Sequence, residues 1–153
     1  MTERVSVKRV EKADLEVLLP LVRAYCDFYE VDPADEALLA LSRRLIEDPV
    51  SEGIQLIART PGGTPIGFAT IYWSWDTTIG GRLAIMHDLY VTPEARGTGA
   101  AQTLMHECAT EARNRGVPEM GWQTALDNHR AQAVYDKTPA HKSTWHDYRI
   151  TLW

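Results

Sequence analysis

The sequence predicts a mixed α/β domain with one central, mostly antiparallel sheet and helices on both of its faces. Apolar residues recur at every second position in the middle of the chain, as in strands. On either side they recur at every third or fourth position, as in amphipathic helices. The resulting order of elements is strand, helix, helix, three strands, helix, strand, helix, strand. The chain has 153 residues, which fits a single domain over 1–153.

The first third of the chain predicts a short strand followed by two helices. Residues 5–10 alternate apolar and polar side chains and predict the strand. Apolar residues between Asp14 and Glu30 recur at every third or fourth position and predict a helix that ends near Glu30. Asp14 is its expected N-cap. An Asp-Pro pair at 32–33 breaks this pattern, and leucines at helical spacing predict a second helix over 37–46.

The middle of the chain predicts an antiparallel meander of three strands. Residues 54–59 form the first expected strand, and a Pro-Gly-Gly-Thr turn at 61–64 separates it from a second strand over 65–75. A further turn at 76–81 precedes a third strand over 82–91. Consecutive strands that are joined by short turns pair in antiparallel fashion.

The last third predicts a long helix, a strand, a short helix and a closing strand. Small and apolar residues lie three, four, seven, eight and eleven positions after Ala101, which is the clearest helical spacing in the chain. A glycine and a proline shortly afterwards end this helix. We expect a strand over 120–125, a short helix over 128–135 and a last strand over 145–153.

Composition narrows the class of protein. A net charge of −5 argues against a nucleic-acid-binding surface and suits a cationic substrate, although mild acidity also aids solubility alone. Cys26 and Cys108 fall at apolar helix positions, so we expect buried thiols in a reducing cytoplasm, with a catalytic thiol as the alternative. No segment resembles a signal peptide or a membrane span of roughly 20 apolar residues. The five histidines show no metal-ligand spacing.

The most informative segment connects the third strand of the meander to the long helix. Its last six residues are Arg96, Gly97, Thr98, Gly99, Ala100 and Ala101. The two glycines can take positive φ and let backbone N–H groups approach a ligand closely. The first turn of the following helix adds unpaired N–H groups with a partial positive charge, and Arg96 adds a full one. These features together predict a phosphate-binding loop.

Two other kinds of phosphate loop fit this segment poorly. A Walker A loop ends in Gly-Lys followed by Ser or Thr, whereas two alanines follow Gly99. A dinucleotide-binding fingerprint needs a third glycine where Gln102 stands. It also belongs to parallel βαβ units, whereas hairpins precede this loop. A glycine-rich connection without a ligand is the remaining alternative.

Three motifs in register resemble those of the GNAT acetyltransferases. The loop at 96–101 fits the family pattern Arg/Gln-x-x-Gly-x-Gly/Ala, and DLYVTP at 88–93 resembles the strand that leads into it. The segment NHRAQAVY at 128–135 is similar to the family's Asn-x-x-Ala-x-x-x-Tyr helix. The resemblance covers about residues 54–135. It implies the GNAT fold, in which a parallel pair of strands splays apart within a mostly antiparallel sheet.

The resemblance implies acetyl-CoA as cosubstrate, with its pyrophosphate on the Gly-rich loop. The residues that it assigns to the pyrophosphate are Arg96, Gly97, Thr98, Gly99, Ala100, Ala101 and, at the helix start, Gln102. The pantetheine arm is expected to pair like an added strand with the backbone of Leu89, Tyr90 and Val91. A strand over 122–125 is expected on the far side of the split.

The short helix carries the remaining expected contacts to the cosubstrate. By the resemblance, Asn128 bonds the pantetheine arm, and Tyr135 is the general acid that protonates the thiolate as CoA leaves. Asn128, Ala131 and Tyr135 lie three and four residues apart and therefore share one helix face. Backbone N–H groups near Leu89 would stabilise the oxyanion. A core aromatic without a catalytic role is the alternative for Tyr135.

A closer resemblance, to the spermidine/spermine (diamine) acetyltransferases, is carried by GFA-x-x-Y at 67–72 and W-x-W-D-x-x-I-G at 73–80. That subgroup has Glu-Asp ahead of the loop, where this chain has His87 and Asp88. His87 would then take up the amine proton, or it is a packed strand residue without a role. Asp88 is expected to hold the substrate ammonium group or, alternatively, to orient the strand. Tyr29 and Glu30 are further expected substrate contacts, with solvated surface side chains as the alternative.

The expected reaction is transfer of the acetyl group to a small cationic primary amine by direct attack in a ternary complex. Acetylation of a protein amine, and acyl-CoA binding without chemistry, are the alternatives. Pro139 stands where the family has glycine after the short helix, which leaves the substrate side open. Because family members are often dimers, we expect a homodimer; we expect no nucleic-acid, membrane or metal partner.

Overall fold

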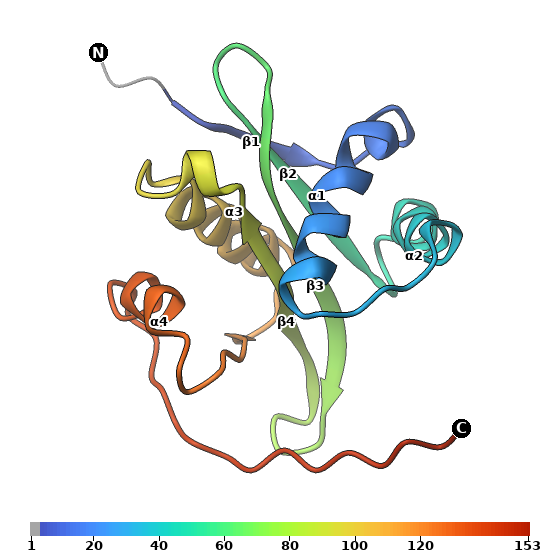
Figure 1. The fold of residues 1–153 in the computed structure, drawn as a ribbon. Helices are drawn as coiled ribbons and strands as arrows, with labels where there is room; N and C mark the ends of the chain where they lie inside the picture. The colour runs from blue at the N-terminus through green and yellow to red at the C-terminus, as the bar shows by residue number, and fades with distance from the viewer. Residues whose placement is uncertain (1–3) are drawn as a thin grey trace. The chain divides into compact units, whose positions relative to one another are not determined.

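The helices and strands follow the predicted order, with one exception near the end of the chain. A computed structural model describes residues 4–153, which fall into two units, one that ends at Gln123 and one over Thr124–Trp153. The first unit contains β1 (Ser6–Arg9), α1 (Leu15–Phe28), α2 (Asp35–Glu47), β2 (Gly53–Arg59), β3 (Pro65–Asp76), β4 (Gly81–Val91), α3 (Ala100–Arg115) and β5 (Met120–Gly121) (Figure 1). Short 3-10 turns, η1 (Lys12–Asp14) and η2 (Pro93–Ala95), precede α1 and α3, and the second unit contains α4 (His129–Tyr135).

The first unit is built on one five-stranded sheet in the order β1-β2-β3-β4-β5. The first four strands pair antiparallel, and β5 lies parallel to β4. This arrangement confirms the mostly antiparallel sheet with one parallel pair. The parallel pair is short, because only Ala84 and Ile85 of β4 pair with β5.

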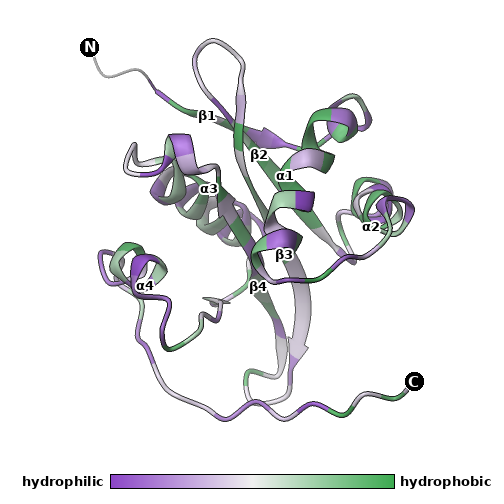
Figure 2. Cartoon of the chain, in the orientation of Figure 1, coloured by the Kyte–Doolittle hydropathy of each residue, from purple (hydrophilic) through white to green (hydrophobic). Residues whose placement is uncertain are grey.

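Helices cover both faces of this sheet (Figure 1). On one face, Phe68 of β3 is fully buried in a cluster with Leu18 and Leu21 of α1. Neighbouring residues of a strand point to opposite faces, and a side chain at Gly67 would meet Leu104 of α3 at 3.2 Å. The hydropathy colouring of Figure 2 shows the apolar residues gathered along the middle of the sheet, between these helices.

A β-bulge interrupts the pairing of β3 and β4. Thr70 is opposite Asp88, whereas the next residue, Ile71, is opposite Met86, so His87 is an extra residue on β4. A bulge bends its strand and increases the local twist. The bulge lies just beyond the point where β4 stops pairing with β5, and it therefore accompanies the splaying of the two strands.

Two of the strand predictions are wrong. The strand expected over 120–125 is limited to Met120–Gly121, because pairing with β4 ends before the bulge. The strand expected over 145–153 does not form: within residues 4–153 nothing pairs with it, and a strand without a partner is not stable in water. Within the same range, no helix combines the length and apolar character that crossing a membrane requires.

Candidate active site

The loop between β4 and α3 has the backbone geometry expected of a phosphate site. Gly97 and Gly99 have φ angles of 79° and 87°, in the left-handed region that favours glycine. The backbone amides of residues 97–99 donate no hydrogen bond to any group in residues 4–153. Gly99 is also the N-cap of α3 and supplies no side chain to cap the first-turn amides. The loop therefore presents a row of free N–H donors at a helix N-terminus.

The loop also leaves room for a ligand. A Cβ atom built on Gly97 or Gly99 would meet no heavy atom within 4 Å. Arg96 is held at the rim by a hydrogen bond from its Nε to the carbonyl oxygen of Val91, at 3.3 Å, which uses one of its five N–H donors. Thr98 turns its hydroxyl inward to the carbonyl oxygen of Ala95. The space, the free amides and the guanidinium fit a pyrophosphate.

The neighbouring edge of β4 is open to an extended ligand. Leu89, Tyr90 and Val91 pair with β3 on one side, opposite Ala69, Phe68 and Gly67. On the other side, the part of the chain that the structure describes places no paired strand beyond Ile85. A ligand with its own amide groups can add to such an edge as a strand would. The residues predicted for the pantetheine arm therefore lie where the sheet is incomplete.

The bulge brings together four residues from three elements. Nδ1 of His87 lies 3.1 Å from Oδ1 of Asp88, and the hydroxyl of Tyr25 on α1 donates to the carbonyl oxygen of His87 at 3.4 Å. The rings of Tyr72 on β3 and His87 are 5.3 Å apart between centroids. The side chain of Asp88 is only 16% exposed, whereas that of His87 is 62% exposed. A sheltered carboxylate thus lies beside an imidazole that reaches solvent.

The two tyrosines of this cluster remain protonated at neutral pH. Burial raises the pKa of Tyr72 to about 12, and the negative charge of Asp88 adds to the effect. Burial, followed by the charge of Asp88, also raises the pKa of Tyr25 far above its ordinary value. Both phenols therefore keep their hydroxyl proton at neutral pH, and the charge of Asp88 acts on both. A carboxylate flanked by aromatic rings is suited to an ammonium group.

The other predicted substrate residues end helix α1. The ring of Tyr29 packs against that of Tyr25, with 4.9 Å between centroids, and joins the cluster through it. Glu30 is exposed and has a φ of 56°, the left-handed conformation common after the last residue of a helix. No contact in the described residues connects the Glu30 side chain with the cluster.

The predicted residues of the short helix lie in the second unit. Oδ1 of Asn128 accepts a hydrogen bond from the backbone N–H of Ala131 at 3.2 Å, so Asn128 is the N-cap of α4. Tyr135 is the last residue of α4. The helix therefore holds the three predicted residues in their expected spacing, while their contacts with acetyl-CoA remain predictions.

The sequence did not reveal that three polar residues, Gln55, Thr70 and Asp88, form a row across the neighbouring strands β2, β3 and β4. Thr70 is fully buried opposite Asp88, and its hydroxyl accepts a hydrogen bond from Nε2 of Gln55 at 3.2 Å. The only available signal was a pair of polar residues at inward-facing positions of two buried strands. Such residues are found in cores when they are hydrogen-bonded to each other.

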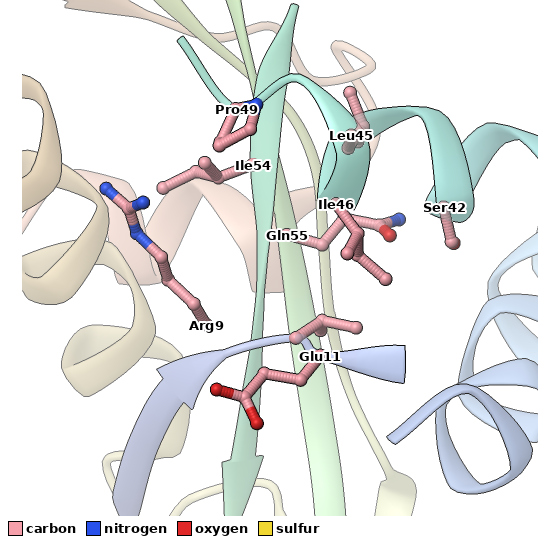
Figure 3. Close-up of a pocket in the computed structure, with 9 residues that line it drawn as sticks. Arg9, Glu11, Ser42, Leu45, Ile46, Pro49, Ile54 and Gln55 are labelled. Atoms are coloured by element: carbon pink, nitrogen blue, oxygen red, sulfur yellow. The ribbon is translucent and has the colours of Figure 1, made fainter. Parts of the chain in front are cut away.

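A small cavity of about 190 Å³ lies at the other end of this row, beneath α2 (Figure 3). Its lining is largely apolar, with Leu45 and Ile46 of α2 facing Ile54 of β2. Oε1 of Gln55 is buried here without a hydrogen-bond partner in the described residues, and a bound water is the ordinary occupant of such a position. None of the predicted site residues lines this cavity.

The structure does not support a catalytic thiol. Cys26 and Cys108 are both buried, and burial raises the pKa of both thiols, that of Cys108 to about 12. A thiol needs a depressed pKa and access to substrate to act as a nucleophile. Within residues 4–153, no group of three or more histidines, cysteines or acidic residues is arranged to hold a metal.

Comparison with known proteins agrees with this geometry. The family described as "Acetyltransferase (GNAT) family" matches residues 19–138. A D-amino-acid N-acetyltransferase of Saccharomyces cerevisiae is 31% identical over 140 residues, which cover 90% of this chain and 85% of the relative. A thialysine N-epsilon-acetyltransferase of Caenorhabditis elegans is 26% identical and covers 79% of this chain and 73% of the relative.

Solved structures show the same fold. An aminoglycoside N-acetyltransferase in complex with CoA matches with a TM-score of 0.84 and 20% identity, covering 100% of this chain and 98% of that one. A protein described as a probable acetyltransferase matches with a TM-score of 0.84 and 23% identity, covering 97% and 98%. With the loop, the open strand edge and the family match in agreement, the chain belongs to the GNAT family of acetyltransferases.

Proposed function

We propose that the chain transfers the acetyl group of acetyl-CoA to a small cationic primary amine, by direct attack in a ternary complex. The observation that carries the amine assignment is the sheltered Asp88 carboxylate, flanked by Tyr25 and Tyr72, on the strand whose edge leads to the phosphate loop. An ammonium group would be attracted by the carboxylate and by the faces of the tyrosine rings. Tyr29 extends the aromatic wall, and Glu30, just after the end of α1, is a further contact for the amine in this proposal.

The loop and the β4 edge hold the acetyl donor in this proposal. The amides of residues 97–99, the first turn of α3 with Ala100, Ala101 and Gln102, and the Arg96 guanidinium bind the pyrophosphate. Leu89, Tyr90 and Val91 bind the pantetheine arm through backbone hydrogen bonds, and Asn128 and Ala131 of α4 complete its site. Backbone N–H groups near Leu89 stabilise the negative charge that develops on the thioester carbonyl oxygen.

Two side chains manage protons. The bound ammonium must lose a proton before its nitrogen can attack, and His87, which reaches solvent beside Asp88, accepts it. As the new C–N bond forms and the C–S bond breaks, Tyr135 gives a proton to the leaving thiolate. The nitrogen releases a second proton and keeps one as the amide N–H. Both catalytic groups are then restored by exchange with water.

We also propose the setting in which this reaction occurs. The two buried free thiols are typical of a protein in a reducing compartment, which supports a cytoplasmic location. A single catalytic domain and a homodimer follow from the family resemblance. The proposal includes no metal, nucleic acid or membrane partner.

The proposal is tested by incubating the protein with acetyl-CoA and a panel of acceptors while the free thiol of CoA is measured. Diamines, basic amino acids and amino sugars should release thiol faster than amines of similar size that carry no second positive charge or that carry a carboxylate. A preference for lysine-containing peptides would instead favour protein acetylation. Thiol release no faster with any amine than without one would leave only acyl-CoA binding.

The general acid is tested by Tyr135→Phe. Loss of the phenolic proton should lower kcat by about 10²-fold or more, because the thiolate would leave unprotonated. The Kd for CoA, measured by calorimetry, should change little. An unchanged kcat would remove Tyr135 from the mechanism.

A further inference from the structure

The cavity beneath α2 is larger than a single structural water requires. Its volume is about 190 Å³, whereas one water occupies about 30 Å³ of the liquid. An apolar protein cavity of about 150 Å³ is large enough for benzene. The cavity beneath α2 therefore has room for a small organic molecule with a body the size of one aromatic ring.

Apolar side chains make up most of the wall of this cavity. Figure 3 shows Leu45 and Ile46 of α2 on one side of strand β2 and Ile54 on the other. Each ordered water needs about two to four polar partners, so a group of waters would be poorly held against such a wall. The apolar body of an organic ligand is favoured there, because its burial removes apolar surface from water.

Two buried polar side chains interrupt the apolar wall, and neither is fully hydrogen-bonded. Gln55 is only 5% exposed; its Nε2 donates to the hydroxyl of Thr70 at 3.2 Å, but its Oε1 accepts no hydrogen bond within residues 4–153. Ser42 of α2 is 3% exposed, and its hydroxyl makes no hydrogen bond in the part of the chain that the structure describes. A ligand that offers an N–H or O–H group to Oε1 of Gln55 removes the cost of this unpaired acceptor.

The charges at the rim of the cavity favour a neutral ligand. Arg9 and Glu11 are the charged residues of the lining, and they have opposite signs. The guanidinium of Arg9 already donates to the carboxylate of Glu111 on α3, from Nε at 3.1 Å and from Nη2 at 2.6 Å. Glu11 is exposed, so water and salt screen its charge. A charged group deeper in the cavity would lack a partner and would pay the full cost of leaving water.

We infer that the cavity beneath α2 is a binding site for a small neutral molecule that has an apolar body and one N–H or O–H donor. The donor bonds Oε1 of Gln55, and the body packs against Leu45, Ile46 and Ile54. The hydroxyl of Ser42 is a second polar contact, from the opposing helix. This site is separate from the proposed acetyl-CoA and amine sites, since none of their residues lines it. The inference therefore does not depend on the proposed function.

The first test uses phenol and toluene, two rings of similar size of which only phenol has a donor. Each is titrated into wild type and Gln55→Met, which keeps the length of the side chain and removes its polar atoms, while backbone amide chemical shifts are followed by NMR. Phenol should saturate one site, with the largest shifts at residues 42–46 and 54–55. In Q55M the Kd for phenol should rise about fivefold, as expected for one hydrogen bond, and the Kd for toluene should not rise. No saturable binding of phenol, shifts confined to residues 87–101, or an equal change for both probes would overturn the inference.

The second test fills the cavity from α2. Ser42→Leu places a branched apolar side chain in the wall, and Ser42→Ala is the matched control, because it removes the hydroxyl but leaves the space. Circular dichroism and urea titration establish that both variants fold. The Kd for phenol should rise about tenfold or more in S42L and less than about threefold in S42A. Binding of phenol by S42L as tight as by wild type would place the probe elsewhere and would contradict the inference.

Discussion

Tyr25 joins helix α1 to the bulge of β4. Its ring packs edge-on against Phe68, with 5.8 Å between centroids, and its hydroxyl donates to the carbonyl oxygen of His87. The raised pKa keeps this hydroxyl a donor at neutral pH, beside the Asp88 carboxylate. A single phenol thus links the core, the bulge and the proposed amine site.

The substitution Tyr25→Phe tests this link. It keeps the ring in the core and removes only the donor, so the free energy of unfolding should change by about 1 kcal/mol or less. The KM for the amine should rise about tenfold, because the carboxylate and the bulge lose a positioning contact, whereas the Kd for CoA should not change. Steady-state kinetics and a urea titration measure the two effects. An unchanged KM for the amine would show that the hydroxyl is structural only.

Asp88→Asn tests the charge of the amine site. Loss of a charge-assisted contact, worth about 1.5–3 kcal/mol, should lower kcat/KM for cationic amines by about 10–100-fold. The same substitution should lower the pKa of Tyr72 from about 12 but leave it above its ordinary value, since burial persists. Spectrophotometric titration of the tyrosines gives this second readout. Equal loss for neutral and cationic amines, with no change in the titration, would contradict the assignment.

Single residues also show where sequence reasoning stops. The backbone geometry of the loop at 96–101 could be predicted, because it rests on neighbouring residues and on backbone freedom at two glycines. The contact of Tyr25 with His87 could not, because it joins positions 62 residues apart. The pairing of Gln55 with Thr70 depends on the register of β2 and β3, which the alternation of side chains does not give.

At the scale of elements, local signals predicted every helix and the three long strands. The ends of α3 are an example: Gly99 and Gly116 both have positive φ, and they are the N-cap and the C-cap of the helix. The bulge at His87 has no comparable signal, because it is a mismatch between two strands and not a property of either. The strand predicted over 145–153 failed for the related reason that a strand exists only with a partner.

The junction of η1 with β2 depends on pH through Asp14. Its carboxylate accepts a hydrogen bond from the Glu11 N–H at 2.8 Å and forms an ion pair with Arg59 at 2.7 Å. Burial alone would raise the pKa of Asp14, but these two contacts outweigh it and hold that pKa below its ordinary value. The contribution to stability is therefore complete above the unfolded-state pKa of about 3.9 and is lost as the pH falls through the folded-state value.

Asp14→Asn should accordingly lower the free energy of unfolding by about 1–2 kcal/mol at pH 7. The difference from wild type should narrow as the pH falls below about 4, where the wild-type carboxylate becomes protonated as well. Urea titrations of both proteins at several pH values measure this difference. A difference that stays constant from pH 7 to pH 2 would show that the charge of Asp14 does not matter.

At the scale of the whole molecule, the proposed sites lie in sequence along β4. The loop proposed to bind phosphate follows the end of this strand, the open edge precedes the loop, and the bulge with Asp88 and His87 comes before that edge. One strand would therefore place the proposed donor and acceptor sites next to each other. The placement of α4 depends on contacts between distant segments, which no local pattern predicts, so Tyr135 was assigned by family resemblance alone.

The central claim, that the loop at 96–101 binds the pyrophosphate of CoA, is tested most directly by calorimetric titration of CoA into two glycine variants. Gly99→Val places a branched side chain where a ligand would lie. Gly63→Val is the matched control, because Gly63 also has positive φ and open surroundings but lies in the turn between β2 and β3. Both should lose similar stability from backbone strain. We predict that the Kd for CoA rises at least tenfold in G99V and stays near the wild-type value in G63V; equal CoA binding by wild type and G99V would contradict the claim.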